Sequence, residues 1–330
     1  MKKIICFLLV VCIFTSGCGK TDSKNVVNRF KKKMNQSSGY QIKGKLSIQN
    51  NDEVYHYDVE AFHKKDHYYK VALTNTANNH TQIILKNDEG VYVLTPALNK
   101  SFRFQSDWPY PHSQVYLLDA LLTDLENDSE KKFQVEKDHY VFQLKCNYPT
   151  NSKFVRQKLE FSSDLKPEKV SVYDSNDVEV MTMEFKKVKY SPKLSKEDFN
   201  IEDIMDKKSY EKVQETSSIE DIIYPLFVPE GTKLIGEEKI EKTNGERVIM
   251  NYDGEKSFLL VEETADVFDE LTIIPTSGEP YFLMDTLGIM TNNSLSWTSG
   301  GIDYYLVSDV MSSQELVPVA QSISGIVSMK

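Results

Sequence analysis

Two short clusters in this 330-residue chain contain residue types that bind metal ions. His63-Lys64-Lys65-Asp66-His67 sets two imidazoles and a carboxylate around a turn, with His56 nearby, and Zn²⁺ accepts such ligands. Asp174-Ser175-Asn176-Asp177 has the oxygen atoms of a calcium loop but lacks its later glycine and glutamate. The lysines in the first cluster and the polar composition of the second are typical of exposed turns. We therefore expect no metal and no cofactor.

The motifs that mark common catalytic and nucleotide-binding sites are absent from the sequence. It contains no G-x-S-x-G, no G-x-G-x-x-G after a strand, no P-loop, no H-E-x-x-H and no paired C-x-x-C. Each would place a nucleophile, a phosphate cradle or metal ligands on a recognisable element. The sequence therefore predicts that the protein is not an enzyme.

Cys18 indicates a different chemistry, the covalent attachment of lipid. Lys2 and Lys3 precede an apolar stretch, residues 4–14, that is shorter than the roughly 20 residues of a membrane span. Thr15-Ser16-Gly17 then leads into Cys18, which resembles a lipobox, with Thr15 where that pattern prefers Leu. An ordinary secretory signal cleaved after Gly17 would leave the same cysteine first. We expect a signal peptide at residues 1–17 and a lipidated tether at residues 18–24.

A lipidated Cys18 would hold the protein on a membrane without a spanning helix. Two or three acyl chains such as palmitate contribute about 0.8 kcal/mol for each buried CH₂ group. Cys6 and Cys12 leave with the signal peptide, so Cys146 has no cysteine to pair with. We expect a membrane lipoprotein on the extracytoplasmic face of the cell membrane, stabilised by burial and not by disulfides.

The charges divide the chain into two unequal parts. Residues 18–214 contain 31 Lys and Arg against 29 Asp and Glu, a net charge of +2, whereas residues 215–330 contain 6 against 20, a net charge of −14. An acidic surface is repelled by nucleic acid and by anionic lipid headgroups. We therefore expect no nucleic-acid partner and a second domain held away from the membrane, although a merely soluble surface would explain the same composition.

Hydrophobic periodicity predicts an α+β fold that is mainly antiparallel β. Apolar residues at helical spacing in residues 26–34 predict a first helix, and Ser113 is a candidate N-cap for a second. Between and after them, residues 40–104 and 133–189 alternate with period two and contain hairpin turns. About ten strands with two helices on one side predict a half-open, curled β-barrel lidded by helices.

A polar stretch at residues 206–218 predicts a linker to a second, small acidic α/β domain at residues 219–330. Strands are expected at residues 233–242, 246–252 and 256–262, because Asn244-Gly245 and Asp253-Gly254 are strong hairpin signals. Leu295-Ser296-Trp297 starts another strand pair, and Ser312 or Ser313 starts a last helix.

The first domain, residues 25–205, resembles a known family. The segments that show this are GYQIKGKLSI, VYVLTPALNKSFRFQSDWP, SQVYLLDALL and KLEFSSDLKPEKVSVYD. They resemble the Lol-type lipoprotein carriers, which include LolA and RseB, and most of all the branch of Gram-positive sporulation lipoproteins related to YdcC and GerS. The second domain resembles a small domain of unknown function. The resemblance implies a sheet with a hydrophobic concave face and a role in the cell envelope, sporulation or germination.

Six apolar residues are the candidates for binding a ligand in such a concave face. Phe102, Phe104 and Trp108 share one parity along an extended segment, and leucines of the second helix face them. Packing in a closed core explains the same pattern. In a carrier-like fold these side chains would instead line a groove for an acyl chain, a lipopeptide or an apolar segment of a partner. The candidates are Phe102, Phe104, Trp108, Leu117, Leu118 and Leu121.

These observations support a leading hypothesis and an alternative. The leading hypothesis is a tethered, non-enzymatic protein that binds a lipid-like ligand or a protein partner. The resemblance implies a peptidoglycan-modifying enzyme as such a partner. The alternative is a two-domain sensor of envelope stress that restrains a membrane regulator, because related sensors pair a large domain with a small one. A sensor would release its partner when a ligand binds, whereas a scaffold would bind constitutively.

Overall fold

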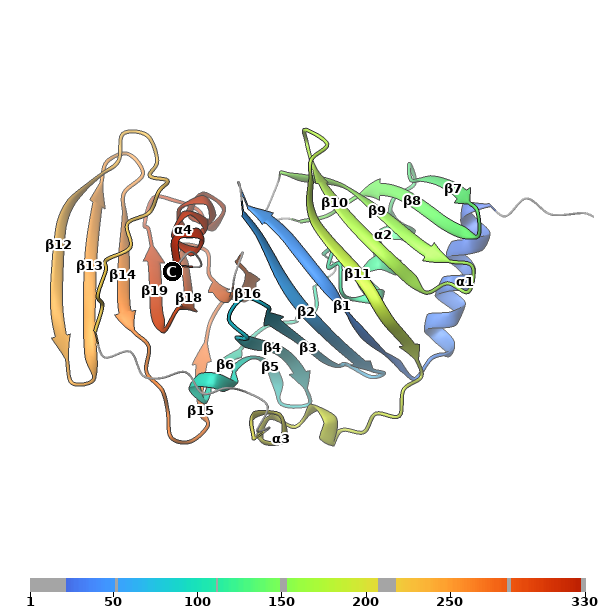
Figure 1. Ribbon diagram of the computed structural model, residues 1–330, viewed down its shortest axis with the longest axis horizontal. Coiled ribbons are helices and arrows are strands. Elements are labelled where there is room, and N and C mark those ends of the chain that lie inside the picture. The colour runs from blue at the N-terminus through green and yellow to red at the C-terminus, as the bar shows by residue number, and fades with distance from the viewer. Residues whose placement is uncertain are drawn as a thin grey trace, which may run out of the picture.

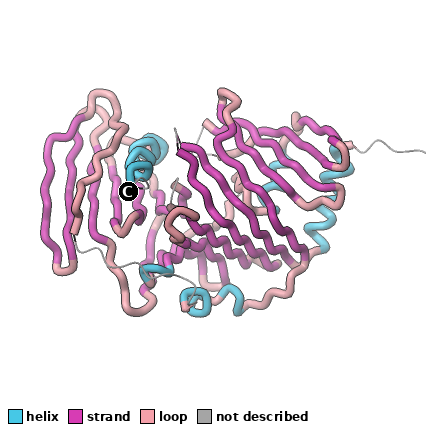
Figure 2. Tube along the Cα trace, viewed as in Figure 1, coloured by secondary structure: helices cyan, strands magenta, loops and turns pink. Residues whose placement is uncertain are grey.

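The computed structural model describes residues 22–50, 53–110, 112–148, 153–206, 218–283 and 286–327. They form two sheets that lie side by side, with helices packed against them (Figures 1 and 2). The expected signal peptide and all but the ends of the expected linker fall outside the described residues. Within those residues, no helix has both the length and the hydropathy to cross a membrane.

The first sheet has twelve strands, and every neighbouring pair is antiparallel except β15 with β6. Its edges, β7 and β15, do not pair with each other, so the sheet is curled and not closed, as the sequence predicted (Figure 1). The register between β1 and β11 shifts at Gly44, where a Cβ atom would lie 2.3 Å from the Glu184 carbonyl oxygen. Such irregularities bend a sheet. Its strands are β1 (Gly39–Asn50), β2 (Glu53–Lys64), β3 (Tyr68–Asn75), β4 (Thr81–Asn87), β5 (Gly90–Thr95), β6 (Lys100–Phe104), β7 (Lys132–Glu136), β8 (His139–Lys145), β9 (Phe154–Ser162), β10 (Pro167–Asp174), β11 (Glu179–Tyr190) and β15 (Thr272–Thr276).

Two helices, α1 (Ser23–Gln36) and α2 (Leu118–Asn127), pack into the hollow of this sheet. Asp22 begins α1, because its carboxylate accepts a hydrogen bond from the Asn25 amide at 2.7 Å. The apolar stripe of α1 is buried, and the Phe30 ring meets Phe161 of β9 edge-on at 5.1 Å. The predicted pair of helices on one side of the sheet is confirmed.

Ser113 does not cap the second helix, which corrects the sequence-based prediction. The helix begins at Leu118, and its N-cap Leu117 makes no side-chain hydrogen bond. The Ser113 hydroxyl instead accepts a hydrogen bond from the Asn147 amide at 2.7 Å, and the Ser113 amide donates to the Asn147 carbonyl at 2.9 Å. This pair of bonds ties the loop before the helix to the end of β8.

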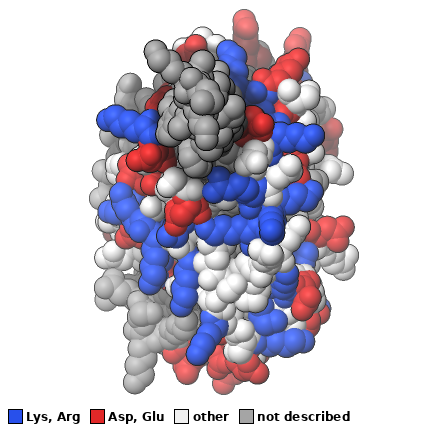
Figure 3. Space-filling model, turned by 90° about the vertical axis from the view of Figure 1, so that its right-hand side faces the viewer, with Lys and Arg blue, Asp and Glu red and all other residues white. Residues whose placement is uncertain are grey.

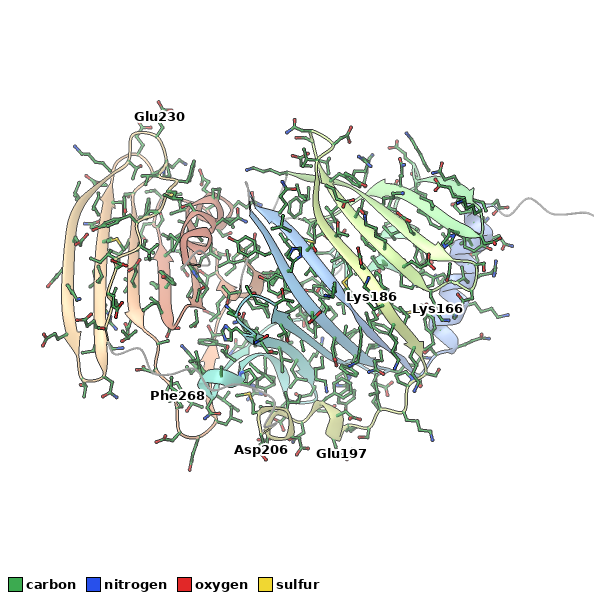
Figure 4. The ribbon with its side chains drawn as sticks, viewed as in Figure 1. Lys166, Lys186, Glu197, Asp206, Glu230 and Phe268 are labelled. Atoms are coloured by element: carbon green, nitrogen blue, oxygen red, sulfur yellow. The ribbon has the colours of Figure 1, made fainter. Side chains whose placement is uncertain are left out.

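The outer face of β3, β4 and β5 is covered by a short segment that the sequence did not reveal. A 3-10 turn (Glu197–Phe199) and α3 (Ile201–Met205) pack there and bury Phe199, Ile201 and Ile204. Figure 4 labels Glu197 and Asp206 at the two ends of this segment. The strands in this region are therefore buried on both faces.

The second sheet has seven antiparallel strands in the order β12-β13-β14-β19-β18-β17-β16. The helix α4 (Ser313–Val327) packs on β18, and its Leu316, Val319 and Ile323 complete a separate apolar core. The predicted strand at residues 233–242 matches β12, and the next two match β13 and β14 within a few residues. The strands are β12 (Lys233–Lys242), β13 (Gly245–Asp253), β14 (Phe258–Thr264), β16 (Glu279–Phe282), β17 (Leu287–Met290), β18 (Ser294–Ser299) and β19 (Ile302–Val307).

Candidate functional site

An apolar cavity of about 160 Å³ lies where the hollow of the first sheet meets the second sheet. Engineered apolar cavities of about 150 Å³ bind benzene, so this one has room for a single ring-sized group. The chain's own helices and a hairpin of the second sheet fill the rest of the hollow. The cavity is lined by Leu46, Ile48, Ile84, Trp108, Tyr110, His112, Ser113, Gln114, Val115, Tyr116, Tyr148, Phe154, Met181, Glu279, Pro280, Tyr281, Phe282, Leu287 and Gln321.

Both parts of the chain build this cavity. Leu46 and Ile48 of β1 come from the first sheet, whereas Pro280, Tyr281 and Phe282 come from β16 of the second. The Phe282 ring packs edge-on against Tyr57 of β2 at 5.3 Å. Our sequence-based hypothesis placed the ligand in the first domain alone. The cavity instead depends on a hairpin that lies more than 200 residues after β1 in sequence.

Gln82 of β4 fastens that hairpin inside the hollow. Its side-chain oxygen accepts hydrogen bonds from the Thr286 hydroxyl at 2.8 Å and the Leu287 amide at 2.5 Å. Its side-chain nitrogen donates to the Leu287 carbonyl at 3.2 Å. Gln82 is only 6% exposed, so an unpaired amide here would be costly. The three bonds position β17 against the first sheet.

Two further contacts hold the sheets together. The Lys100 ammonium, which is 8% exposed, forms an ion pair with Asp303 of β19 at 2.7 Å. The Asn99 side chain donates to the Phe268 carbonyl at 2.6 Å, just before β15 pairs with β6. Figure 4 labels Phe268 where the C-terminal part of the chain reaches the first sheet. The cavity therefore has walls that are fixed on both sides.

Trp108 forms one wall of the cavity and is held by the loop that contains it. Its indole nitrogen donates to the Gln114 side chain at 3.1 Å, and its amide donates to the Ser106 hydroxyl at 3.1 Å. The Tyr69 ring meets it edge-on at 5.8 Å. A buried tryptophan whose N–H group already has a partner presents an apolar ring surface to the cavity.

One residue of the cavity lining, Tyr148, also has an unpaired polar atom. The Tyr148 hydroxyl is buried and has no hydrogen-bond partner among the described residues. Burial raises the pKa of Tyr148 and of Tyr116 well above that of an ordinary phenol, so both hydroxyls stay neutral and can donate a hydrogen bond. The Glu279 carboxylate and the His112 imidazole add polar groups to the lining. An occupant that carries a hydrogen-bond acceptor beside an apolar group would satisfy this cavity.

The two histidines of the candidate metal cluster have separate partners. The His63 ring stacks on Tyr69 at 4.3 Å, and its Nδ1 atom lies 3.1 Å from the Tyr68 carbonyl oxygen. Burial lowers the pKa of His63, which favours the neutral ring. His67 instead pairs with Asp88 at 2.9 Å. Across the described ranges, no three His, Cys, Asp or Glu side chains form a metal-binding group.

The structure does not gather the six candidate ligand-binding residues at one place. Trp108 lines the cavity, and Phe102 lines a second gap of about 180 Å³ between the sheets, opposite Trp297 and Tyr305. The other four are core residues of the hollow, each at most 3% exposed, namely Phe104, Leu117, Leu118 and Leu121. A ligand role for these residues remains a prediction.

Sequence reasoning missed the residues that complete the cavity, above all Pro280, Tyr281, Phe282 and Gln321. The prolines in β15 and β16 make this region look unlike strand, because proline cannot donate a ladder hydrogen bond. The apolar run at residues 281–283 was the available signal. Tyr148 was missed because nothing in its neighbourhood suggests a buried hydroxyl.

The protein has an unclosed, curled antiparallel sheet with helices packed in its hollow. Its sequence defines its family: the chain belongs to the YdcC-like sporulation protein family, whose model matches residues 1–199. It is 38% identical to sporulation protein YdcC of Bacillus subtilis strain 168 over 323 residues, 96% of this chain and 95% of that protein. The predicted resemblance to the sporulation branch is confirmed.

Similar solved structures are more distant. In the MucA/MucB complex of Pseudomonas aeruginosa, the match covers 93% of this chain and 97% of the other, at 12% identity and a TM-score of 0.34. A LolA superfamily protein from Nitrosomonas europaea matches 55% of this chain and 99% of its own, at 11% identity and a TM-score of 0.31. The family assignment follows from the sequence match.

Proposed function

We propose that this sporulation-family protein is a non-enzymatic binding protein, tethered by lipid at Cys18 to the extracytoplasmic face of the membrane. In this proposal it receives an apolar side chain of a protein partner in the cavity beside Trp108. The observation that carries the proposal is the combination of that cavity with the unpaired Tyr148 hydroxyl. The kinship to a sporulation protein supports a role in spore formation.

The size and polarity of the cavity favour a peptide over a lipid. A long acyl chain needs a continuous channel, and the hollow is filled by α1, α2 and the β16–β17 hairpin. A ring-sized space fits one anchoring side chain, and such anchors contribute most of the energy at many interfaces. Tyr148 then donates to a carbonyl oxygen of the bound peptide, which a hydrocarbon chain does not possess.

A variant that fills the cavity tests whether a protein partner binds there. The full-length protein is purified from membranes of sporulating cells, and the proteins and lipids bound to it are quantified by mass spectrometry. Gln321 lines the cavity from α4, so Gln321→Trp places a large ring at the site that the partner would occupy. Gln314→Trp adds the same ring to an exposed position of the same helix and is the matched control.

The proposal expects a stoichiometric protein partner to be recovered with the unmodified chain and with Gln314→Trp. The amount recovered with Gln321→Trp should be at least tenfold lower, which corresponds to a loss of roughly 1.4 kcal/mol in binding free energy. Equal recovery with all three proteins would contradict the role of the cavity. Recovery of lipid alone, displaced by Gln321→Trp, would replace the peptide with an acyl ligand.

A separate variant tests the anchor. Cys18→Ala is expected to move the protein from the membrane fraction to the soluble extracytoplasmic fraction, because it removes the thiol that carries the acyl chains. Mass spectrometry of the N-terminal peptide reads the modification directly. Unchanged retention of Cys18→Ala on the membrane would contradict the anchor.

A further inference from the structure

Helix α1 presents basic side chains to solvent on the side opposite its buried stripe. Lys24, Arg29, Lys31 and Lys32 are exposed on this helix, while Val26, Val27, Phe30 and Met34 face the core. Asp22, the N-cap, is the only acidic residue of residues 22–36. The helix therefore separates an apolar inner face from a cationic outer face.

Lysines from neighbouring turns enlarge this cationic face. The Lys65 ammonium donates to the Asn35 carbonyl at 2.5 Å, which places it at the C-terminal end of α1. Lys166 lies beside α1 because its partner Asp164, at 2.7 Å, offers its carbonyl oxygen to Lys33 of the helix. We call this set the basic α1 surface; it consists of Lys24, Arg29, Lys31, Lys32, Lys65 and Lys166.

Few carboxylates offset the basic α1 surface. Glu126 pairs with Lys31 and Asp164 with Lys166, whereas Lys24 and Lys32 have no partner among the described residues. Figure 3 shows this side of the molecule, with Lys and Arg side chains spread across its middle. Figure 4 labels Lys166 beside α1. The surface thus keeps unpaired positive charge that an anionic surface could neutralise.

The position of this surface in the chain identifies what it faces. Only three residues lie between Cys18 and Asp22, and the four steps of an extended chain span at most about 3.6 Å each, or about 14 Å in total. A lipid on Cys18 therefore keeps α1 close to the bilayer, near the distance over which headgroup charge is felt. The acidic part of the chain, residues 215–330, carries a net charge of −14 and is repelled by the same surface.

We propose that the basic α1 surface docks on anionic phospholipid headgroups of the membrane that holds Cys18. This inference rests on the proposed lipid anchor. Docking orients the molecule, with α1 on the membrane and the acidic second sheet turned outward. The cavity then has a fixed direction relative to the membrane, and the tether alone would leave that direction free.

Lysine footprinting on nanodiscs tests the orientation. The lipidated full-length protein is reconstituted into discs of phosphatidylcholine alone or with roughly one third phosphatidylglycerol. A water-soluble acetylating reagent then modifies exposed lysines, and mass spectrometry reads each site. Lys186 and Lys233, which are exposed and lie on other elements, serve as internal references.

Acetylation of Lys24 and Lys32 is expected to fall at least about threefold on the anionic discs and to recover in about 0.5 M salt, because salt screens headgroup charge. Lys186 and Lys233 are expected to react equally on both discs. The double variant Lys24→Glu, Lys32→Glu should also remove the protection of Lys65, whereas Lys186→Glu, Lys233→Glu should preserve it.

Equal acetylation of Lys24 and Lys32 on the two kinds of disc, with the protein still bound to both, would overturn the docking and leave the anchor intact. A protein that does not remain on either disc and carries no lipid mass on Cys18 would overturn the anchor and the docking together. Protection that persists in high salt would also contradict an electrostatic contact.

Discussion

At the scale of single residues, a few buried polar groups determine how the two parts of the chain meet. The side-chain oxygen and nitrogen of Gln82 both form hydrogen bonds with residues 286–287, and no apolar side chain can replace these bonds. Lys100 and Asp303 add a mostly buried ion pair nearby. The cavity thus depends on polar contacts that are invisible in a hydrophobic pattern.

Replacing Gln82 tests its role in stability. Gln82→Leu keeps a similar volume but removes the side-chain hydrogen bonds to the Leu287 amide and carbonyl, so we predict a loss of about 1–3 kcal/mol in the free energy of unfolding. Urea unfolding measures the loss. Gln134→Leu, at an exposed position of β7, is the control and should change stability by less than about 0.5 kcal/mol. Equal losses would show that Gln82 does not fasten the hairpin.

Cys146 gives a second prediction at this scale. Burial, with the nearby Asp124 charge adding to it, raises the pKa of the Cys146 thiol to about 12. Because the thiolate is the reactive form, we predict slow alkylation by iodoacetamide at pH 8 in the folded protein and fast alkylation in urea. Mass spectrometry follows the reaction. Alkylation at the same rate in both states would contradict the protection of this half-buried thiol.

At the scale of elements, the C-terminal helix α4 matters because it closes the second core and lines the cavity. Its start is held by Glu315, whose carboxylate accepts hydrogen bonds from the Ser312 amide and hydroxyl, each at 2.9 Å. Lys256 also bonds this carboxylate at 2.5 Å. The Glu315 carboxylate thus makes the return bond of a capping box, and the ion pair with Lys256 reinforces it.

The capping carboxylate predicts a pH dependence. The Lys256 bond, followed by the Ser312 bonds, lowers the pKa of Glu315 from 4.5 to about 2. A lowered folded-state pKa means that the ionised carboxylate stabilises the fold above pH 4.5, and that this contribution is lost as the pH falls toward 2.

Glu315→Gln should therefore be less stable than the unmodified chain at pH 7, and the difference should shrink between pH 4.5 and pH 2. Urea unfolding at several pH values measures this difference, with Glu230→Gln as an exposed control. A difference that stays constant down to pH 2 would contradict the assignment.

The elements also show what sequence patterns can and cannot predict. Helix α1 and strands β12 to β14 were predictable, because their apolar period and their Asn-Gly and Asp-Gly turns are local signals. Strands β15 and β16 each contain a proline; β15 pairs with β6, which is distant in sequence, whereas β16 pairs with the neighbouring β17. Ser113 was misassigned because its hydroxyl bonds Asn147, a contact set by tertiary structure.

The same limit applies to the candidate site. Trp108 was predictable as a candidate, because its parity with Phe102 and Phe104 is a local pattern. Two of its neighbours in the cavity come from the second part of the chain: Tyr281 lies on β16 of the second sheet, and Gln321 lies on α4. No local signal could have joined them.

At the scale of the whole molecule, the two sheets form one mechanical unit. The Gln82 bonds and the Lys100–Asp303 ion pair cross between them, and β15 of the C-terminal part joins the first sheet by pairing with β6. Leu287 and Ile289 of the C-terminal part belong to the apolar core of the first sheet. The first sheet would therefore not retain its observed core without the C-terminal part.

We therefore predict that the protein unfolds in a single cooperative transition. The chain has two tryptophans, Trp108 in the first part and Trp297 in the second, so Trp108→Phe and Trp297→Phe each leave one local fluorescent probe. Urea midpoints from each remaining tryptophan should coincide with the midpoint from circular dichroism in the same variant. Two separated midpoints within one variant would show that the sheets unfold independently.

Photocrosslinking from the cavity tests the central claim, that this cavity receives a protein partner, most directly. Benzoylphenylalanine replaces Tyr110, which lines the cavity, or Tyr224, which is 45% exposed before β12, in the full-length protein of sporulating cells. We predict a protein adduct from position 110 that Gln321→Trp abolishes, and no such adduct from position 224. A position-110 adduct that survives Gln321→Trp, or one that contains only lipid, would contradict the account.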